Sequence, residues 1–139
     1  MIHCCPAQLN QVFLNIINNA IDALEDYTQT IQSSSSLMTF QPLGLFQPRI
    51  TLQTQQLNID QIQVRIRDNG PGIPLEVQSK LFDPFFTTKA VGKGSGLGLS
   101  VAYQIIERHH GTIRVASAAG QGTTFIVTLP IQGTTPGTD

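Results

Sequence analysis

The residue whose type and position most suggest ligand chemistry is Asp68. Segment Gln63–Arg67 alternates apolar and polar residues, which predicts a half-buried strand, and turn residues follow directly. A carboxylate at a strand end can accept hydrogen bonds from an exocyclic amine. Gly70 and Gly72 would let the backbone approach a flat ligand, because glycine has no Cβ. Asp-Asn-Gly by itself also fits an Asx turn without a ligand.

A second group of residues suits phosphate. Four glycines alternate along one segment, at Gly92, Gly94, Gly96 and Gly98. An apolar helical run opens at Leu97–Val101, and the N-terminus of a helix favours bound anions. Lys89 and Lys93 would add positive charge. The spacing matches neither a P-loop nor a dinucleotide fingerprint, because Gly94 follows Lys93, so the glycine pattern alone is a weak indicator.

The first predicted helix, Pro6–Tyr27, carries a polar row beside its apolar stripe. Asn15, Asn19 and Asp22 follow one another at steps of four and three, so they share a face. Asparagine is a mediocre helix former, and its presence along a core helix therefore needs a reason. The row is either a solvated stripe or a set of oxygen donors for a ligand.

Five segments together resemble the motifs of one family, in the family's order. They are Asn15–Ala23 (N box), Asp68–Ile73 (first glycine box), Phe82–Phe86 (F box), Gly94–Leu99 (second glycine box) and Gly122–Phe125 (GTTF). This resembles the catalytic, ATP-binding domain of sensor histidine kinases, in the superfamily shared with gyrase B, Hsp90 and MutL. The resemblance covers roughly Pro6 to Pro130. It implies an α/β fold of the Bergerat type, a two-layer sandwich in which helices cover one face of a mixed sheet.

The resemblance also implies roles for individual residues. Asn19 would coordinate Mg²⁺ through its side-chain oxygen, since magnesium prefers oxygen ligands and keeps several waters. Asn15 stands where ATP-hydrolysing relatives carry the glutamate that activates water, and an amide cannot act as a general base. We therefore expect Asn15 and Asn19 to be the catalytic residues of a domain that holds ATP for transfer. The role of Asp22 stays open.

The nucleotide contacts implied by the family come from all these motifs. They are Asn19, Asp22, Asp68, Gly70, Gly72, Ile73, Phe86, Lys89, Lys93, Gly94, Ser95, Gly96, Leu97, Gly98 and Thr123. Segment Thr87–Gly96 is expected to be a lid over the phosphates. The Thr123 hydroxyl would reach the adenine beside Asp68, although β propensity alone also explains a threonine at that position.

The chain is expected to form one domain over residues 1–132, with a loop insertion at about 28–48 and a loose tail over 133–139. Other expected elements are strands Arg49–Gln55, Gln61–Arg67, Thr112–Ala116 and Thr123–Leu129, and helices Pro74–Lys80 and Gly98–His110. We expect His109 and His110, at the end of the last helix, to be structural rather than metal-binding.

Composition excludes several partners. The 139 residues carry a net charge of −1 with scattered basic residues, so neither nucleic acid nor a membrane surface is expected to bind. No apolar run is long enough to span a bilayer, and the N-terminus lacks signal-peptide features. Cys4 and Cys5 are adjacent, which is poor geometry for a disulfide. A cytoplasmic location is the expectation.

The expected function is to bind ATP and Mg²⁺ and to donate the γ-phosphate to a histidine on a separate dimerisation domain, and through it to a response regulator. His3 has no long helix around it, so we take it as a terminal residue and expect a monomeric fragment without the phosphoacceptor. Such a fragment would bind nucleotide without phosphorylating itself. Two alternatives stay open: an ATP-hydrolysing relative and a non-catalytic docking module.

Overall fold

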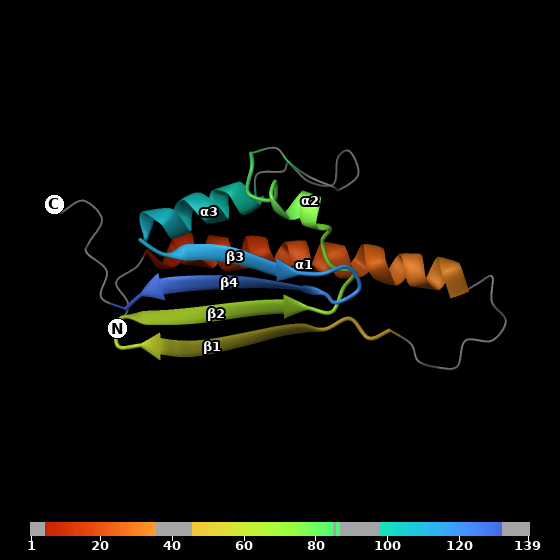
Figure 1. The fold of residues 1–139 in the computed structure, drawn as a ribbon, viewed down its shortest axis with the longest axis horizontal. Helices are drawn as coiled ribbons and strands as arrows, with labels where there is room; N and C mark the ends of the chain where they lie inside the picture. The colour runs from red at the N-terminus through yellow and green to blue at the C-terminus, as the bar shows by residue number, and fades with distance from the viewer. Residues whose placement is uncertain (1–4, 36–45, 85, 87–97, 132–139) are drawn as a thin grey trace.

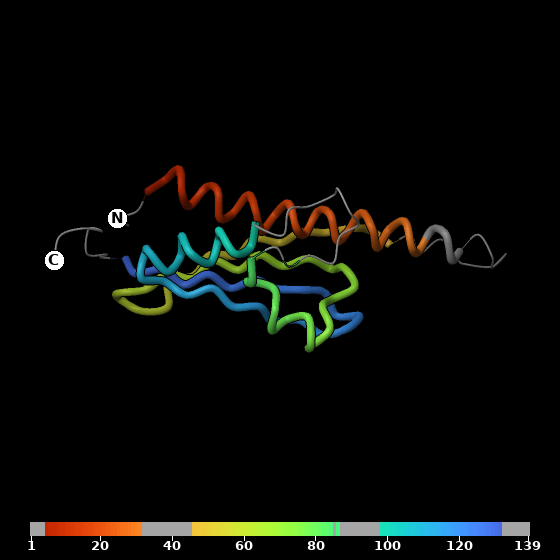
Figure 2. Tube along the Cα trace, turned by 90° about the horizontal axis from the view of Figure 1, so that it is seen from above, coloured from red at the N-terminus to blue at the C-terminus, as the bar shows by residue number. Residues whose placement is uncertain are grey.

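The structure, a computed structural model, describes residues 5–35, 46–84, 86 and 98–131 (Figure 1). Its elements are α1 (Pro6–Ser35), β1 (Ile50–Asn58), β2 (Gln61–Asp68), α2 (Leu75–Gln78), α3 (Gly98–Arg108), β3 (Thr112–Ser117) and β4 (Thr123–Pro130). The strands form one sheet in the order β1-β2-β4-β3. In Figure 2, α1 and α3 lie side by side on one face of that sheet.

The predicted α/β sandwich covered on one face by helices is confirmed. All three pairings between the described strands are antiparallel. The parallel pairing that a mixed sheet requires is therefore not among the described residues. Residues 1–4 lie outside them.

Helix α1 forms because its apolar residues recur every three or four positions and its first residue, Pro6, suits a helix start. Leu9, Val12, Ile16, Ala20 and Leu24 are buried along this stripe. Leu9, Val12 and Ile16 share one cluster with buried residues of α3 and of the sheet. The helix layer and the sheet thus share one core.

The predicted end of the first helix at Tyr27 is wrong, since α1 continues to Ser35. The segment from Thr28 to Ser35 has no apolar period, but it contains neither glycine nor proline. The hydroxyls of Thr28 and Thr30 donate to the carbonyls of Leu24 and Asp26, one turn earlier. The first part of the expected loop insertion is therefore helix, and residues 36–45 lie outside the described chain.

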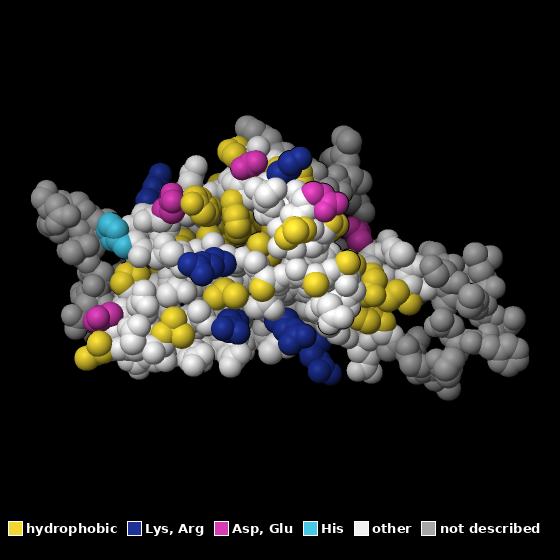
Figure 3. Space-filling model, viewed as in Figure 1, with side chains coloured by type: hydrophobic (Ala, Val, Ile, Leu, Met, Phe, Trp, Pro, Cys, Tyr) yellow, Lys and Arg dark blue, Asp and Glu magenta, His cyan; other side chains and the backbone are white. Residues whose placement is uncertain are grey.

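Strand β4 lies inside the sheet and alternates strictly between buried and half-buried residues. Phe125, Val127 and Leu129 point into the core, and Ile66 on β2 pairs with Phe125. On the other face, Arg65 and Arg114 both pair with Ile126. Figure 3 shows Lys and Arg side chains across this outer face. The polar face looks away from the helices, so the ligand chemistry must be sought on the helix side.

Candidate functional site

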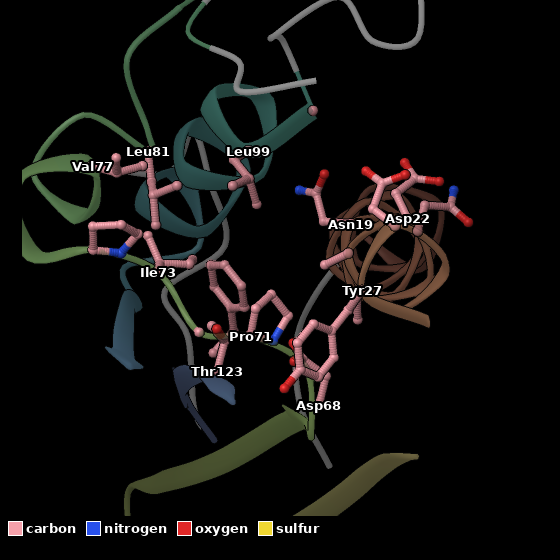
Figure 4. Close-up of a pocket in the computed structure, with 18 of the residues that line it drawn as sticks. Asn19, Asp22, Tyr27, Asp68, Pro71, Ile73, Val77, Leu81, Leu99 and Thr123 are labelled. Carbon is pink, nitrogen blue, oxygen red and sulfur yellow. The ribbon is translucent and has the colours of Figure 1, made fainter. Parts of the chain in front are cut away.

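A cavity of about 830 Å³ lies between α1, the start of α3, α2 and the adjoining ends of β2 and β4. This volume is within the range of small-molecule binding sites. In Figure 4, Asn19 and Asp22 project from α1, Leu99 and Leu81 lie across from them, and Asp68 is at the bottom. The cavity therefore has apolar walls and two separate polar regions.

Asp68 ends β2 and is only 5% exposed. The backbone N–H of Gly70 donates to its Oδ1 at 2.9 Å, which is the Asx turn expected from the sequence. The carboxylate nevertheless also lines the cavity, so the turn and the ligand interpretation are compatible. Burial raises the pKa of Asp68 above its usual 3.8, and hydrogen bonds from the backbone N–H groups of Gly70 and Thr123 partly oppose this.

The glycines after Asp68 are needed by the protein itself. A Cβ on Gly70 would lie 2.9 Å from Oδ1 of Asp68. Gly72 has φ +79, and its Cβ would collide with the backbone carbonyl of Ala118 in the β3–β4 turn. Gly72 lines the cavity, whereas Gly70 is buried behind Asp68. Close packing of two loops explains Gly72, and the tight turn on the Asp68 side chain explains Gly70, so approach of a ligand is not the only reason for these glycines.

Ser117 joins those two loops, a role that sequence reasoning missed. Its Oγ accepts the N–H of Ile73 at 2.8 Å and donates to the carbonyl of Gly122 at 2.8 Å. Because the single Ser117 proton is used there, the Thr123 hydroxyl, 2.9 Å away, is the donor in their contact. Gln78 adds hydrogen bonds to the carbonyls of Ile73 and Ser117, at 2.8 and 2.9 Å. These bonds fix the cavity floor beside Asp68.

The row predicted on the first helix faces the cavity. Asn15, Asn19 and Asp22 all line it, together with Asn18 and Asp26 from the same helix. Asn15 donates from Nδ2 to the carbonyl of Gly98 at 2.9 Å, which connects α1 to the first residue of α3. The row therefore presents amide and carboxylate oxygens beside the position where the glycine-rich segment enters α3.

The remaining predicted contacts divide into two groups. Ile73, Phe86, Gly98 and Thr123 line the cavity. The other group lies outside the described residues and comprises Lys89, Lys93, Gly94, Ser95, Gly96 and Leu97, with the whole of the expected lid, Thr87–Gly96. The cavity also has contacts that the sequence prediction did not include, among them Tyr27 and Val77.

His109 is buried, as expected of a structural residue. Its Nδ1 lies 2.8 Å from the carbonyl of Ile105, and its Nε2 accepts the backbone N–H of Cys5 at 3.1 Å. A carbonyl can only accept, so Nδ1 carries the proton and the ring is neutral. His109 thus connects the start of α1 to the end of α3. It is not among the residues that line the cavity.

The chain matches the model of the family described as histidine kinase-, DNA gyrase B- and HSP90-like ATPase over residues 5–133. This chain belongs to that family. The resemblance drawn from the five sequence motifs is therefore confirmed.

Relatives of the chain are sensor histidine kinases. It is 43% identical to the signal transduction histidine-protein kinase AtoS of Escherichia coli (strain K12) over 123 residues, which are 88% of this chain and 17% of AtoS. The catalytic domain of histidine kinase ThkA, in a nucleotide-free form, has a TM-score of 0.69 at 30% identity, with 94% and 70% of the two chains covered. The mycobacterial sensor histidine kinase MprB has a TM-score of 0.70 at 25% identity, covering 96% and 78%.

Among the curated relatives compared with it, the chain spans between 12% and 32% of the relative's length. In the part of the chain that the structure describes, no helix combines the length and apolar character needed to cross a membrane.

Proposed function

We propose that this domain binds ATP with Mg²⁺ and holds the γ-phosphate for transfer to a histidine on a separate domain. The observation that carries the proposal is the division of one cavity into two polar regions. The buried Asp68 carboxylate lies in one, and the oxygens of Asn19 and Asp22 lie in the other. A nucleotide has the same division, with a flat base at one end and an anionic polyphosphate at the other.

At the base end, Asp68 accepts a hydrogen bond from the exocyclic amine of adenine. The carboxylate is suited to this because the N–H groups of Gly70 and Thr123 orient it and partly oppose the rise that burial causes in its pKa. Ile73, Leu99 and Phe125 supply apolar surface for the rings. The hydroxyl of Thr123 keeps a lone pair for the ligand, because its proton is donated to Ser117.

At the phosphate end, Asn19 would hold Mg²⁺ through its amide oxygen, with Asp22 one turn further along α1. The described residues contain no group of three or more His, Cys, Asp or Glu side chains that could hold a metal ion on their own. That donor set suits Mg²⁺, which retains waters and takes its other ligands from substrate phosphates. The ion would neutralise charge that develops on the phosphates.

Transfer rather than hydrolysis is favoured by Asn15. Its side chain is an amide, and its Nδ2 is already committed to the carbonyl of Gly98. It therefore cannot take a proton from water and instead positions the start of α3. Phosphoryl transfer is mostly a matter of positioning and charge stabilisation, which this cavity can provide without a protein nucleophile.

The names of the relatives support a proposal about the activity of the whole protein. AtoS and ThkA are named histidine kinases, and a relative 36% identical over 125 residues is named two-component sensor PprA. We propose that the acceptor here is the histidine of a dimerisation domain, that a response regulator receives the phosphoryl group, and that the domain acts in the cytoplasm. In isolation it would be a monomer that does not phosphorylate itself.

Calorimetric titration of the chain with ATP, with and without Mg²⁺, tests the proposal. Asp68→Ala should weaken binding more than about tenfold, since hydrogen bonds to charged groups contribute about 1.5–3 kcal/mol. Asn19→Ala should remove the magnesium dependence. The matched controls are Asp60→Ala, a carboxylate in the exposed β1–β2 turn, and Asn10→Ala, on the exposed face of α1. Equal binding by all variants would contradict the proposal, as would label from γ-labelled ATP appearing on this chain alone.

A further inference from the structure

The cavity continues along α1 beyond the residues that the sequence motifs assign. Asp26, Tyr27 and Thr30 line it about two to three turns after Asn19. Figure 4 shows the ring of Tyr27 beside Asp68 and Pro71, on the opposite side of the cavity from Ile73. Tyr27 is only half-buried, as expected for an aromatic ring that borders a cavity rather than the closed core.

The Tyr27 ring packs against the ring of Phe46. Their centroids are 5.0 Å apart and their planes meet at 81°, an edge-to-face contact of the favourable kind. Phe46 precedes β1, in a segment that is itself fixed to the turn after Asp68. Asn69 accepts the N–H of Arg49 at 2.7 Å and donates to the carbonyl of Gln47 at 2.8 Å. The Tyr27 ring is therefore connected, through Phe46 and the hydrogen bonds of Asn69, to the turn that follows Asp68.

We propose that Tyr27 is a base-positioning residue, whose ring forms the aromatic wall against which the purine packs while Asp68 accepts its amine. Phe46 positions the ring. The inference rests on the proposed function, and it specifies how the base is held at that same site. A ring at this place acts on the base and not on the phosphates, because Figure 4 shows it next to Asp68 and away from Asn19.

The test compares three ligands with magnesium: ATP, adenosine and inorganic tripolyphosphate. Contact between a base and an aromatic ring is sequence-tolerant and usually strong, so Tyr27→Ala should weaken ATP and adenosine alike by about fivefold or more. Tripolyphosphate binding should not change. Tyr27→Phe should restore nearly full affinity, because the proposal uses the ring and not the hydroxyl, and Phe46→Ala should give a smaller loss with the same ligand pattern.

Tyr103→Ala is the matched control. Tyr103 also lies on a helix and pairs with a ring, Phe82, with centroids 5.5 Å apart, but it is not among the residues that line the cavity. It should leave all three affinities unchanged. Tyr103→Phe also leaves Tyr27 as the sole tyrosine in a chain without tryptophan, so its emission should change when ATP saturates that variant.

Three results would overturn the inference while leaving the proposed function intact. The first is binding of ATP by Tyr27→Ala as tight as that of the wild type or tighter, which would make the ring unimportant or an obstruction. The second is a loss of tripolyphosphate affinity in Tyr27→Ala as large as the loss for adenosine, which would indicate a general structural defect. The third is unchanged tyrosine emission of Tyr103→Phe at saturating ATP. If the wild type binds neither ATP nor adenosine, the proposed function fails and the inference fails with it.

Discussion

Asp68 and Thr123 lie opposite each other across β2 and β4, and the backbone N–H of Thr123 donates to the Asp68 carboxylate. Ser117, at the end of β3, pairs with the same threonine from the other side. The last residues of β2 and β3 and the first residue of β4 therefore lie side by side at the cavity floor. The residue that would select the base is held by the sheet and not by a loose loop.

Ser117→Ala should destabilise the fold by about 1–3 kcal/mol, because it leaves the N–H of Ile73 and the carbonyl of Gly122 without their partner. It should also weaken ATP binding, since the loop after Asp68 loses its attachment. Urea denaturation and calorimetry measure the two effects. Ser79→Ala is the control, since that exposed hydroxyl only donates to the carbonyl of Glu76. Equal stabilities for the two variants would contradict the role of Ser117.

Gly120 and Gly122 offer a matched pair of substitutions. Both have positive φ, +78 and +77, but a Cβ on Gly120 meets nothing within 4 Å, whereas one on Gly122 collides with the backbone carbonyl of Asp68. Gly120→Ala should cost only the left-handed strain of about 1–2 kcal/mol. Gly122→Ala should cost clearly more and should reduce ATP affinity. The proposed packing is wrong if thermal denaturation shows the same loss for both variants.

The elements of this fold were largely predictable, because they depend on local periodicity. The apolar stripe of α1 and the alternation in β2 and β4 are visible in the sequence, and Asp68 is recognisable as a strand-end carboxylate. Ser117 was not recognisable as a site residue. Its importance depends on the register between β3 and β4, which long-range pairing determines.

The course of α1 after Tyr27 was missed for a different reason. Its last two turns lack an apolar stripe and end in serines, so the sequence favours a loop there. Tyr27 consequently looked like the end of a helix. Its place beside Asp68 depends on the extra turns and on Phe46, which is 19 residues later in the sequence.

The ionisation of Asp68 should make stability depend on pH. Burial raises its pKa in the folded protein above 3.8, so between those two values the native state binds more protons than the unfolded state. The free energy of unfolding of the wild type, relative to Asp68→Asn, should therefore fall as pH rises from 3.8 through the raised pKa, and then level off. Urea titrations of both proteins across acidic pH measure this difference. A difference that rises with pH would contradict the predicted shift.

His109→Ala should loosen the start of α1. The substitution removes the acceptor of the Cys5 N–H and the donor to the carbonyl of Ile105, so a loss of about 1–3 kcal/mol is expected. Amide hydrogen exchange should increase most in the first turns of α1. His110→Asn is the control, because His110 is exposed and has φ +58, a conformation that asparagine tolerates. Faster exchange spread evenly over the whole chain would argue against a local tie.

The most direct measurement of the central claim is the affinity of the wild type and of Asp68→Asn for ATP and GTP, with magnesium present. The carboxylate can accept from the amine of adenine but cannot donate to the carbonyl of guanine. The wild type should therefore prefer ATP, and Asp68→Asn, which can donate, should lose most of that preference by weaker ATP binding. Equal affinity of the wild type for both nucleotides, or an unchanged preference in the variant, would contradict the assignment of Asp68 as the residue that selects the base.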